Sequence, residues 1–234
     1  MENKKTIVGI IIVLILIIGL VVVSYQYNIY NTEQIKLLTD ETNTLLKTDI
    51  IKEEINSDVK TEKNFAIVEK TIKEYLLKLK NIYSNINELY NQINPNDIFS
   101  AQNIEDQSFE EIDKIIEDYR QKGKDILAEY KELIQEENIS NSIKEKKITF
   151  RKDYFVNLYN TAMLSEAMKE KYNLIQREIE DKKDQLSYKL NKLEKIEEYL
   201  KDNTKYWVIK NDKIQFTNIN KMTDYYNLLN QVED

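Results

Sequence analysis

Four pairs of adjacent glutamates are the residues of this chain best suited to chemistry. Neighbouring carboxylates can divide acid and base roles between them, or bind Ca²⁺ through their oxygens. The chain has no histidine and no cysteine, so the usual general base, the thiolate nucleophile and the common zinc ligands are missing. The pairs are Glu53-Glu54, Glu110-Glu111, Glu136-Glu137 and Glu197-Glu198.

These pairs are more typical of solvated helix surfaces than of an active site. The chain is 32% charged, and it contains no phosphate-binding glycine loop, HExxH, GxSxG or EF-hand pattern. We therefore predict that the protein is not an enzyme and has no catalytic, cofactor-binding or metal-ligating residue and no cofactor. A net charge of -7 also argues against a nucleic-acid partner.

Turn-forming residues are scarce, with three Gly and one Pro in 234 residues. Sandwiches and nucleotide-binding α/β folds need many tight turns, so long helices are favoured. We predict an all-α fold, in the form of an elongated antiparallel helical bundle or coiled coil. A small β-hairpin near the C-terminus completes the prediction.

The strongest helical signal lies between residues 65 and 93. Apolar residues follow one another there at alternating steps of three and four, which is a heptad register over four repeats. Asn94-Pro95 ends this helix, and residues 95–107 form a polar connection. The heptad residues are Phe65, Val68, Ile72, Tyr75, Leu79, Ile82, Ile86, Leu89 and Ile93.

A second heptad run begins after Ser108, which forms a capping-box pattern with Glu111. Gly123 occupies a core position in this run, and we interpret it as a close contact between helices; a kink is the alternative. The run comprises Phe109, Ile112, Ile116, Tyr119, Gly123, Ile126, Tyr130 and Leu133.

The remaining helical patterns are weaker. Residues 31–60 suggest a helix that either runs straight into the next one or breaks near Asn56-Ser57-Asp58. Residues 143–201 suggest one long helix or two joined ones. Lys182 and Lys189 interrupt the apolar seam there and could leave part of the helix projecting beyond the bundle. Candidate core residues in the last segment are Phe150, Tyr154, Leu158, Met168, Tyr172, Ile175, Ile179, Leu186, Leu193, Ile196 and Leu200.

Residues 206–216, YWVIKNDKIQF, alternate between apolar and polar types on both sides of Asn211-Asp212. This pattern predicts a hairpin, with Trp207, Ile209, Ile214 and Phe216 on one buried face. Asn218 then caps a last helix, at about 218–231. We interpret the hairpin as an end-piece of the bundle; the alternative is an aromatic recognition tip.

The N-terminal segment MENKK is followed by an apolar run, and Ile7 to Val23 contains no charged residue. Such a run predicts a transmembrane signal anchor over residues 6–24, with a cleaved signal peptide as the alternative. Lys4 and Lys5 then place residues 1–5 in the cytoplasm and the helical-bundle domain, 25–234, outside the cell. The predicted localisation is therefore the cell membrane, single-pass, with most of the chain extracytoplasmic.

The ending KYWVIKNDKIQFTNINKMTDYYNLL, behind an N-terminal anchor and heptad helices, resembles uncharacterised single-pass helical envelope proteins of bacteria. The layout is also similar to that of cell-wall-binding lipoproteins of Gram-positive bacteria. That likeness implies contact with the cell wall. The chain departs from those lipoproteins because it has no cysteine to carry a lipid.

These features together predict a non-enzymatic, membrane-anchored scaffold or partner-binding module at the bacterial cell envelope. Its predicted partners are the lipid bilayer, through residues 6–24, and a protein partner or a second copy, through the heptad helices. One alternative is a ligand-binding or sensor ectodomain that works with a separate transducer. The other is a secreted, membrane-active helical protein, if the N-terminal segment is cleaved.

Overall fold

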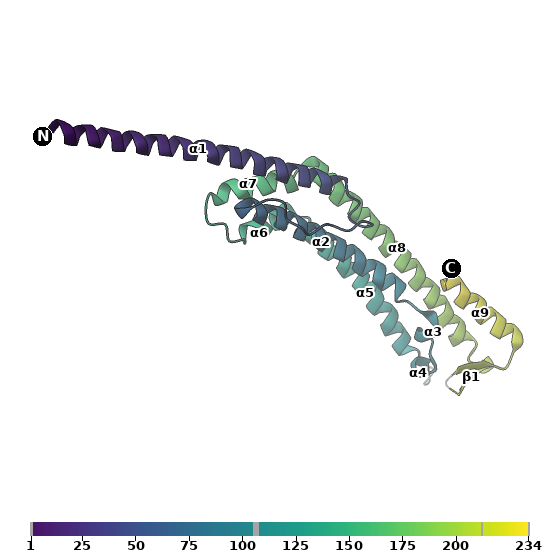
Figure 1. The fold of residues 1–234 in the computed structure, drawn as a ribbon. Helices are drawn as coiled ribbons and strands as arrows, with labels where there is room; N and C mark the ends of the chain where they lie inside the picture. Colours follow the sequence, from purple (N-terminus) through teal and green to yellow (C-terminus); the bar gives the residue numbers. More distant parts are fainter. Residues whose placement is uncertain (1, 105–107, 212, 234) are drawn as a thin grey trace. The chain divides into compact units, whose positions relative to one another are not determined.

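A computed structural model describes residues 2–104, 108–211 and 213–233, with side chains from Ser24 onward (Figure 1). The described chain is mostly helical, as predicted, with one two-stranded hairpin near its C-terminus. The elements are α1 (Glu2–Lys47), α2 (Lys63–Asn91), α3 (Pro95–Ile98), α4 (Ala101–Ile104), α5 (Glu110–Leu133), α6 (Glu136–Lys144), α7 (Lys152–Met163), α8 (Glu166–Asp202), η1 (Thr204–Tyr206), β1 (Trp207–Lys210), β2 (Lys213–Phe216) and α9 (Ile219–Glu233).

The chain forms two compact units. The first comprises residues up to Tyr75 together with Ser140–Ser165, and the second comprises Leu76–Ile139 and the chain from Glu166 onward. Aromatic packing marks the core of the first unit: the rings of Phe65 and Phe155 meet edge to face, with centroids 5.0 Å apart. Leu38, Leu45 and Ile50 are buried in the same unit.

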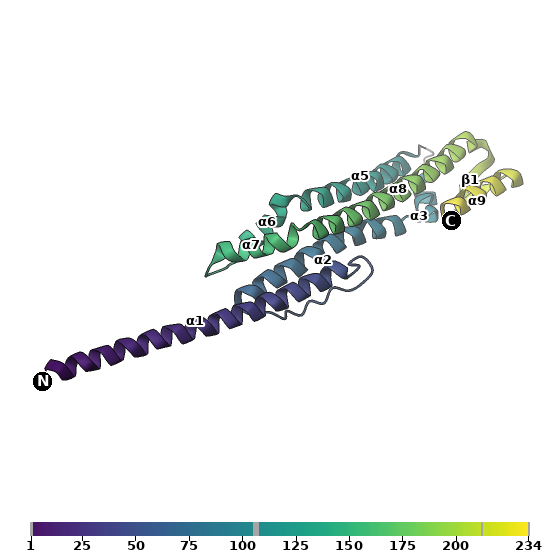
Figure 2. The ribbon, with the colours of Figure 1, turned by 90° about the horizontal axis from the view of Figure 1, so that it is seen from above.

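In the second unit, α5 and α8 lie side by side and run in opposite directions (Figures 1 and 2). Four cross-helix ion pairs record this direction, because residues late in α5 or just after it meet residues early in α8. The pairs are Glu136–Lys169 at 2.8 Å, Lys131–Glu180 at 3.1 Å, Arg120–Glu194 at 2.6 Å and Asp113–Lys201 at 3.8 Å.

The heptad prediction for residues 65–93 is confirmed, since all nine apolar residues are buried. Asn94 ends this stretch as predicted: its side chain caps α3 by accepting the backbone N–H of Asn96 at 3.0 Å, with Pro95 at the first helical position. Two short helices, α3 and α4, occupy the connection that we predicted as polar, and Ile98, Phe99 and Ile104 are buried in it. Its residues 105–107 lie outside the described residues.

Gly123 is a close helix contact, as interpreted, and α5 runs through it without a break. A Cβ added there would lie 2.8 Å from a methyl carbon of Leu186 on α8. The capping box at Ser108 is wrong. The helix begins at Glu110, and Phe109 precedes it in a left-handed conformation with φ 61°. Ser108 Oγ accepts the Glu110 N–H at 3.3 Å, and no side chain caps the start of α5.

Two helix predictions need correction. The pattern over residues 31–60 is not one helix, because α1 ends at Lys47 and the chain runs to α2 without regular structure, although Ile50 and Ile55 are buried there. In the segment 143–201 the option of two joined helices holds for α7 and α8, but these begin only at Lys152: α6 ends at Lys144, and Arg151 adopts φ 51° before α7. Phe150 is consequently 62% exposed, and Phe155 and Tyr159 fill the core in place of Tyr154 and Leu158.

The predicted core of α8 is confirmed from Met168 to Leu200. Lys182 and Lys189 do not leave the helix projecting into solvent. Their ammonium groups lie 4.9 and 4.8 Å from the ring centre of Tyr90, at the end of α2. The two lysines therefore cover an aromatic ring of a neighbouring helix.

The hairpin pairs Trp207 with Phe216 and Ile209 with Ile214, as the alternation predicts. These four residues are buried or half-buried, whereas Val208, Lys210 and Gln215 are exposed. Asn211 takes the turn with φ 54°, and Asp212 lies outside the described residues. Asn218 caps α9 by accepting the backbone N–H of Asn220 at 3.0 Å.

The membrane prediction is contradicted. Side chains are described from Ser24 on, and from there α1 carries exposed charges such as Glu33, Lys36 and Asp40, so this part of the helix is not an apolar span. Within the described parts of the chain, no helix is long and apolar enough to cross a membrane. We therefore correct the transmembrane signal anchor over 6–24 and the single-pass localisation. The predicted contact of residues 6–24 with the lipid bilayer followed from these two predictions, so it is withdrawn with them.

Candidate functional site

Two adjoining hollows of the second unit lie between α5 and the stretch of chain from Asn85, late in α2, to Ile98 in α3. The first has a volume of about 500 Å³ and the second about 270 Å³, and Gln92 and Lys122 line both. We call the combined surface the α2–α5 groove. Its lining residues are Asn85, Glu88, Leu89, Gln92, Asn94, Asp97, Ile98, Glu111, Lys114, Ile115, Asp118, Tyr119, Lys122, Asp125, Ile126 and Glu129.

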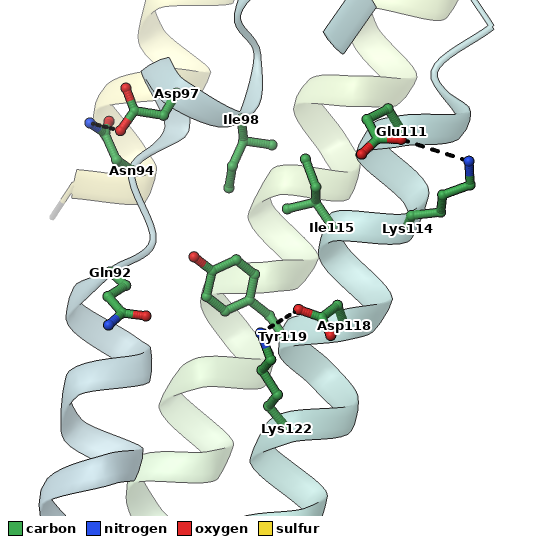
Figure 3. Close-up of a pocket in the computed structure, with 10 residues that line it drawn as sticks. All are labelled: Gln92, Asn94, Asp97, Ile98, Glu111, Lys114, Ile115, Asp118, Tyr119 and Lys122. Carbon is green, nitrogen blue, oxygen red and sulfur yellow. Dashed lines mark hydrogen bonds and ion pairs between the residues drawn. The ribbon is translucent and has the colours of Figure 1, made fainter.

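The floor of the α2–α5 groove is apolar. Leu89 and Ile98 are buried, and Ile115, Tyr119 and Ile126 of α5 are half-buried. Figure 3 shows Ile98, Ile115 and Tyr119 directed toward one another across the first hollow. The side chains from α5 therefore present part of their apolar surface to the groove rather than to the core.

The heptad register explains why this floor is only half-buried. Within the second run, Ile116, Gly123 and Tyr130 are fully buried, at steps of seven. Tyr119 and Ile126 belong to the same predicted seam. Each lies three residues after a buried member of the first row, and both are half-buried. In a complete coiled coil both sets face a partner helix. Ile112 begins the same row as Tyr119 and Ile126 and is fully buried, so the structure leaves this row of the α5 seam incompletely covered only from Tyr119 onward.

The rim of the groove is acidic. Three carboxylates line the first hollow, Asp97, Glu111 and Asp118, against Lys114 and Lys122. Three more line the second. Both lysines are already paired: Lys122 lies 2.6 Å from Asp118, whose hydrogen bond raises the pKa of that lysine, and Lys114 lies 3.7 Å from Glu111.

The unpaired carboxylates lie along the rest of the groove. Asp97 accepts a hydrogen bond from the Asn94 amide at 2.9 Å, and Asp125 accepts one from the Gln121 amide at 2.7 Å. Glu88 and Glu129 are exposed and form no ion pair with any residue in the described part of the chain. The groove therefore carries an uncompensated negative charge above an apolar floor.

The four carboxylate pairs singled out in the sequence do not come together. Glu53 and Glu54 are exposed after α1, and Glu136 pairs with Lys169. Glu111 lines the α2–α5 groove, whereas Glu197 is buried elsewhere in the second unit. Among the described residues, no group of three carboxylates is placed to hold a metal ion.

A cluster of buried charges in the first unit was not predicted. Lys73 of α2 is 2% exposed, and its ammonium group lies 2.8 Å from Glu41 of α1 and 2.9 Å from Glu69. The same group donates to the backbone carbonyl of Asp58 at 2.5 Å. Lys60 also pairs with Glu41. The only local hint is Leu76, an apolar residue on the same helix face as Glu69 and Lys73.

Glu69 ties the segment between α1 and α2 to the helix. Its carboxylate accepts the backbone N–H of Thr61 at 2.9 Å, the Thr61 hydroxyl at 2.8 Å and the backbone N–H of Lys60 at 3.0 Å. Burial alone would raise the pKa of Glu69, but Lys73 and these donors outweigh it and hold the pKa below its ordinary value. The same balance, with Lys60 and Lys73, lowers the pKa of Glu41.

The second buried carboxylate, Glu197, has the opposite electrostatics. It is 3% exposed and lies 2.5 Å from Lys201, whose side chain is 43% exposed. Burial raises the pKa of Glu197, and the neighbouring carboxylate of Asp113 adds to the rise, which the Lys201 hydrogen bond only partly offsets. The carboxylates of both clusters are therefore paired with lysines of the same chain, in a fully buried set around Lys73 and in a half-exposed pair at Lys201.

Burial of Trp207 argues against the aromatic recognition tip. Trp207 is 1% exposed, its indole N–H donates to the Leu200 carbonyl at 2.9 Å, and its ring meets Phe109 edge to face at 6.2 Å. The interpretation as an end-piece of the fold is therefore supported by burial of the one tryptophan.

Comparisons with protein-family models, with curated proteins and with solved structures find no match to this chain. The likeness to bacterial envelope proteins and the cell-wall contact that it implies stay predictions.

Proposed function

We propose that this protein is a non-enzymatic, helical partner-binding module whose binding face is the α2–α5 groove. The observation that carries the proposal is the incompletely covered row of α5, Tyr119 and Ile126, at the floor of a groove. Partly exposed apolar residues at heptad positions, as Tyr119 and Ile126 are, are a feature of surfaces that receive another helix. The antiparallel bundle is the scaffold in this proposal, and the α5–α8 ion pairs support it.

Site-specific crosslinking tests this function. A photoreactive phenylalanine analogue is introduced at Asp125, on the exposed rim of the groove, and separately at Glu178, an exposed position of α8 outside it. In the native host we expect a discrete crosslinked product from position 125 and none from position 178. Adding Ile126→Asp, which places a charge on the apolar floor, should abolish the product.

Two results would overturn the proposal. One is a crosslinking pattern that is the same at positions 125 and 178. The other is a product from position 125 that persists with Ile126→Asp, because the apolar floor would then have no part in binding. Circular dichroism of the Ile126→Asp variant shows whether the helices are intact, so loss of folding is recognised separately.

A further inference from the structure

The length of the α2–α5 groove corresponds to a helix of about five turns. Along α5 it runs from Glu111 to Glu129, which is about five turns or roughly 27 Å at about 1.5 Å per residue. Its half-buried apolar residues, Ile115, Tyr119 and Ile126, fall on one side of α5 at helical spacing. A helix laid along this line would bury its apolar stripe on them, as in other grooves that receive helices.

The charge of the groove indicates which kind of helix binds there. The groove has six carboxylates and two lysines, and both lysines are paired with rim carboxylates. An occupant that carries lysine or arginine beside its apolar stripe would meet Glu88, Asp125 and Glu129, which no lysine or arginine in the described chain neutralises. An acidic helix would add like charge to the same rim and be repelled.

We propose that the occupant is a basic amphipathic helix of about 18 residues, supplied by another protein. The inference rests on the proposed function, because it names the partner chemistry for the same groove. A second copy of this chain is a poorer occupant, since each copy has a net charge of -7. The net attraction is electrostatic, so salt should weaken it.

Three synthetic peptides test the proposal against the full-length chain. The first is an 18-residue helix with leucines on one face and lysines on the other; the second replaces every lysine with glutamate; the third has the first peptide's composition in an order that scatters the leucines around the helix. Fluorescence anisotropy at low and at physiological salt measures binding. We expect the first peptide to bind at least tenfold more tightly than either other peptide, and more weakly as salt rises.

Matched charge reversals locate the binding. Asp125→Lys with Glu129→Lys changes the groove, and Glu178→Lys with Asp181→Lys makes the same change of charge on exposed positions of α8 outside it. We expect the groove variant to weaken binding of the basic peptide at least tenfold and the α8 variant less than threefold. Equal effects would show attraction to the net charge alone and would overturn the inference.

The outcomes separate the two proposals. If the position-125 crosslink forms but the basic peptide does not bind, the groove is a binding face and the chemistry assigned to its occupant is wrong. If neither is observed, the proposed function fails as well. A concentration-dependent dimer in sedimentation that Ile126→Asp dissociates would identify the occupant as a second copy, and would also overturn the inference.

Discussion

Glu69–Lys73 and Glu197–Lys201 are the same sequence pattern, a glutamate followed four residues later by a lysine on one helix. In both pairs the glutamate is buried, yet the pKa of Glu69 is lowered and that of Glu197 is raised. Around Glu69 the additional neighbours are donors, the backbone N–H groups of Lys60 and Thr61. Around Glu197 the additional neighbour is a second carboxylate, Asp113.

The lysines differ as much as the glutamates. The Lys73 side chain is 3% exposed and is shared by two carboxylates, whereas the Lys201 side chain is 43% exposed. Removing one member of a closed, buried set leaves uncompensated charge, and water cannot replace it. A half-exposed pair is screened, so it contributes little. The Glu–Lys spacing alone therefore does not predict how much such a pair contributes to the free energy of unfolding. That contribution depends on the groups that surround the pair.

The largest effect is expected from Lys73→Met. Glu41 and Glu69 would remain buried without their shared cation, which typically costs about 3–5 kcal/mol of unfolding free energy. Urea unfolding at pH 7 measures the loss. The matched control is Lys70→Met on the same helix, where the lysine side chain is 67% exposed and the change should stay within about 0.5 kcal/mol. Equal losses in the two variants would refute the comparison.

A smaller effect with a clear pH dependence is expected from Glu69→Gln, at about 1–3 kcal/mol at pH 7. Because the pKa of Glu69 is lowered on folding, its contribution is complete above the ordinary carboxylate pKa and is lost as the pH falls through the folded value. Urea midpoints between pH 7 and pH 3 should therefore decline less steeply for the variant. A constant difference across this range would contradict the assignment.

The smallest effect is expected from Glu197→Gln, which at pH 7 should leave stability unchanged or raise it by up to about 1 kcal/mol. Folding raises the pKa of Glu197, so its stabilising contribution is present below the ordinary value and is lost as the pH rises through the folded value. The gain of the variant should therefore shrink on acidification. A loss as large as that of Glu69→Gln would show that both pairs act alike.

The parts of the fold that follow from local pattern were predictable. Nine heptad residues of 65–93 are buried, and the hairpin alternation matches its register, because periodicity is a property of the element itself. Lys73 and Glu69 were not predictable as core residues. They are buried because the chain between α1 and α2 folds across them. The residues next to Glu69 and Lys73 in the sequence do not predict this long-range contact.

The groove shows the same limit. The spacing of the apolar residues predicts that Tyr119 and Ile126 belong to the same seam as Ile116 and Gly123. It does not predict which row of this seam a second helix covers. That depends on how closely α5 and α8 approach, and Gly123 sets this distance through its contact with Leu186. The break at Arg151 was missed for a related reason, since a left-handed φ at a basic residue has no signature in apolar periodicity.

Trp207 provides an intrinsic fluorescence probe of unfolding. It is the one tryptophan of the chain, and it lies in the second unit, sealed by the Leu200 carbonyl and the Phe109 ring. Its emission should shift to longer wavelength when the hairpin end of that unit opens, while far-ultraviolet dichroism follows the helices of both units. Superimposable denaturation curves would mean that the two units melt as one; separated curves would give each unit its own midpoint, without any label.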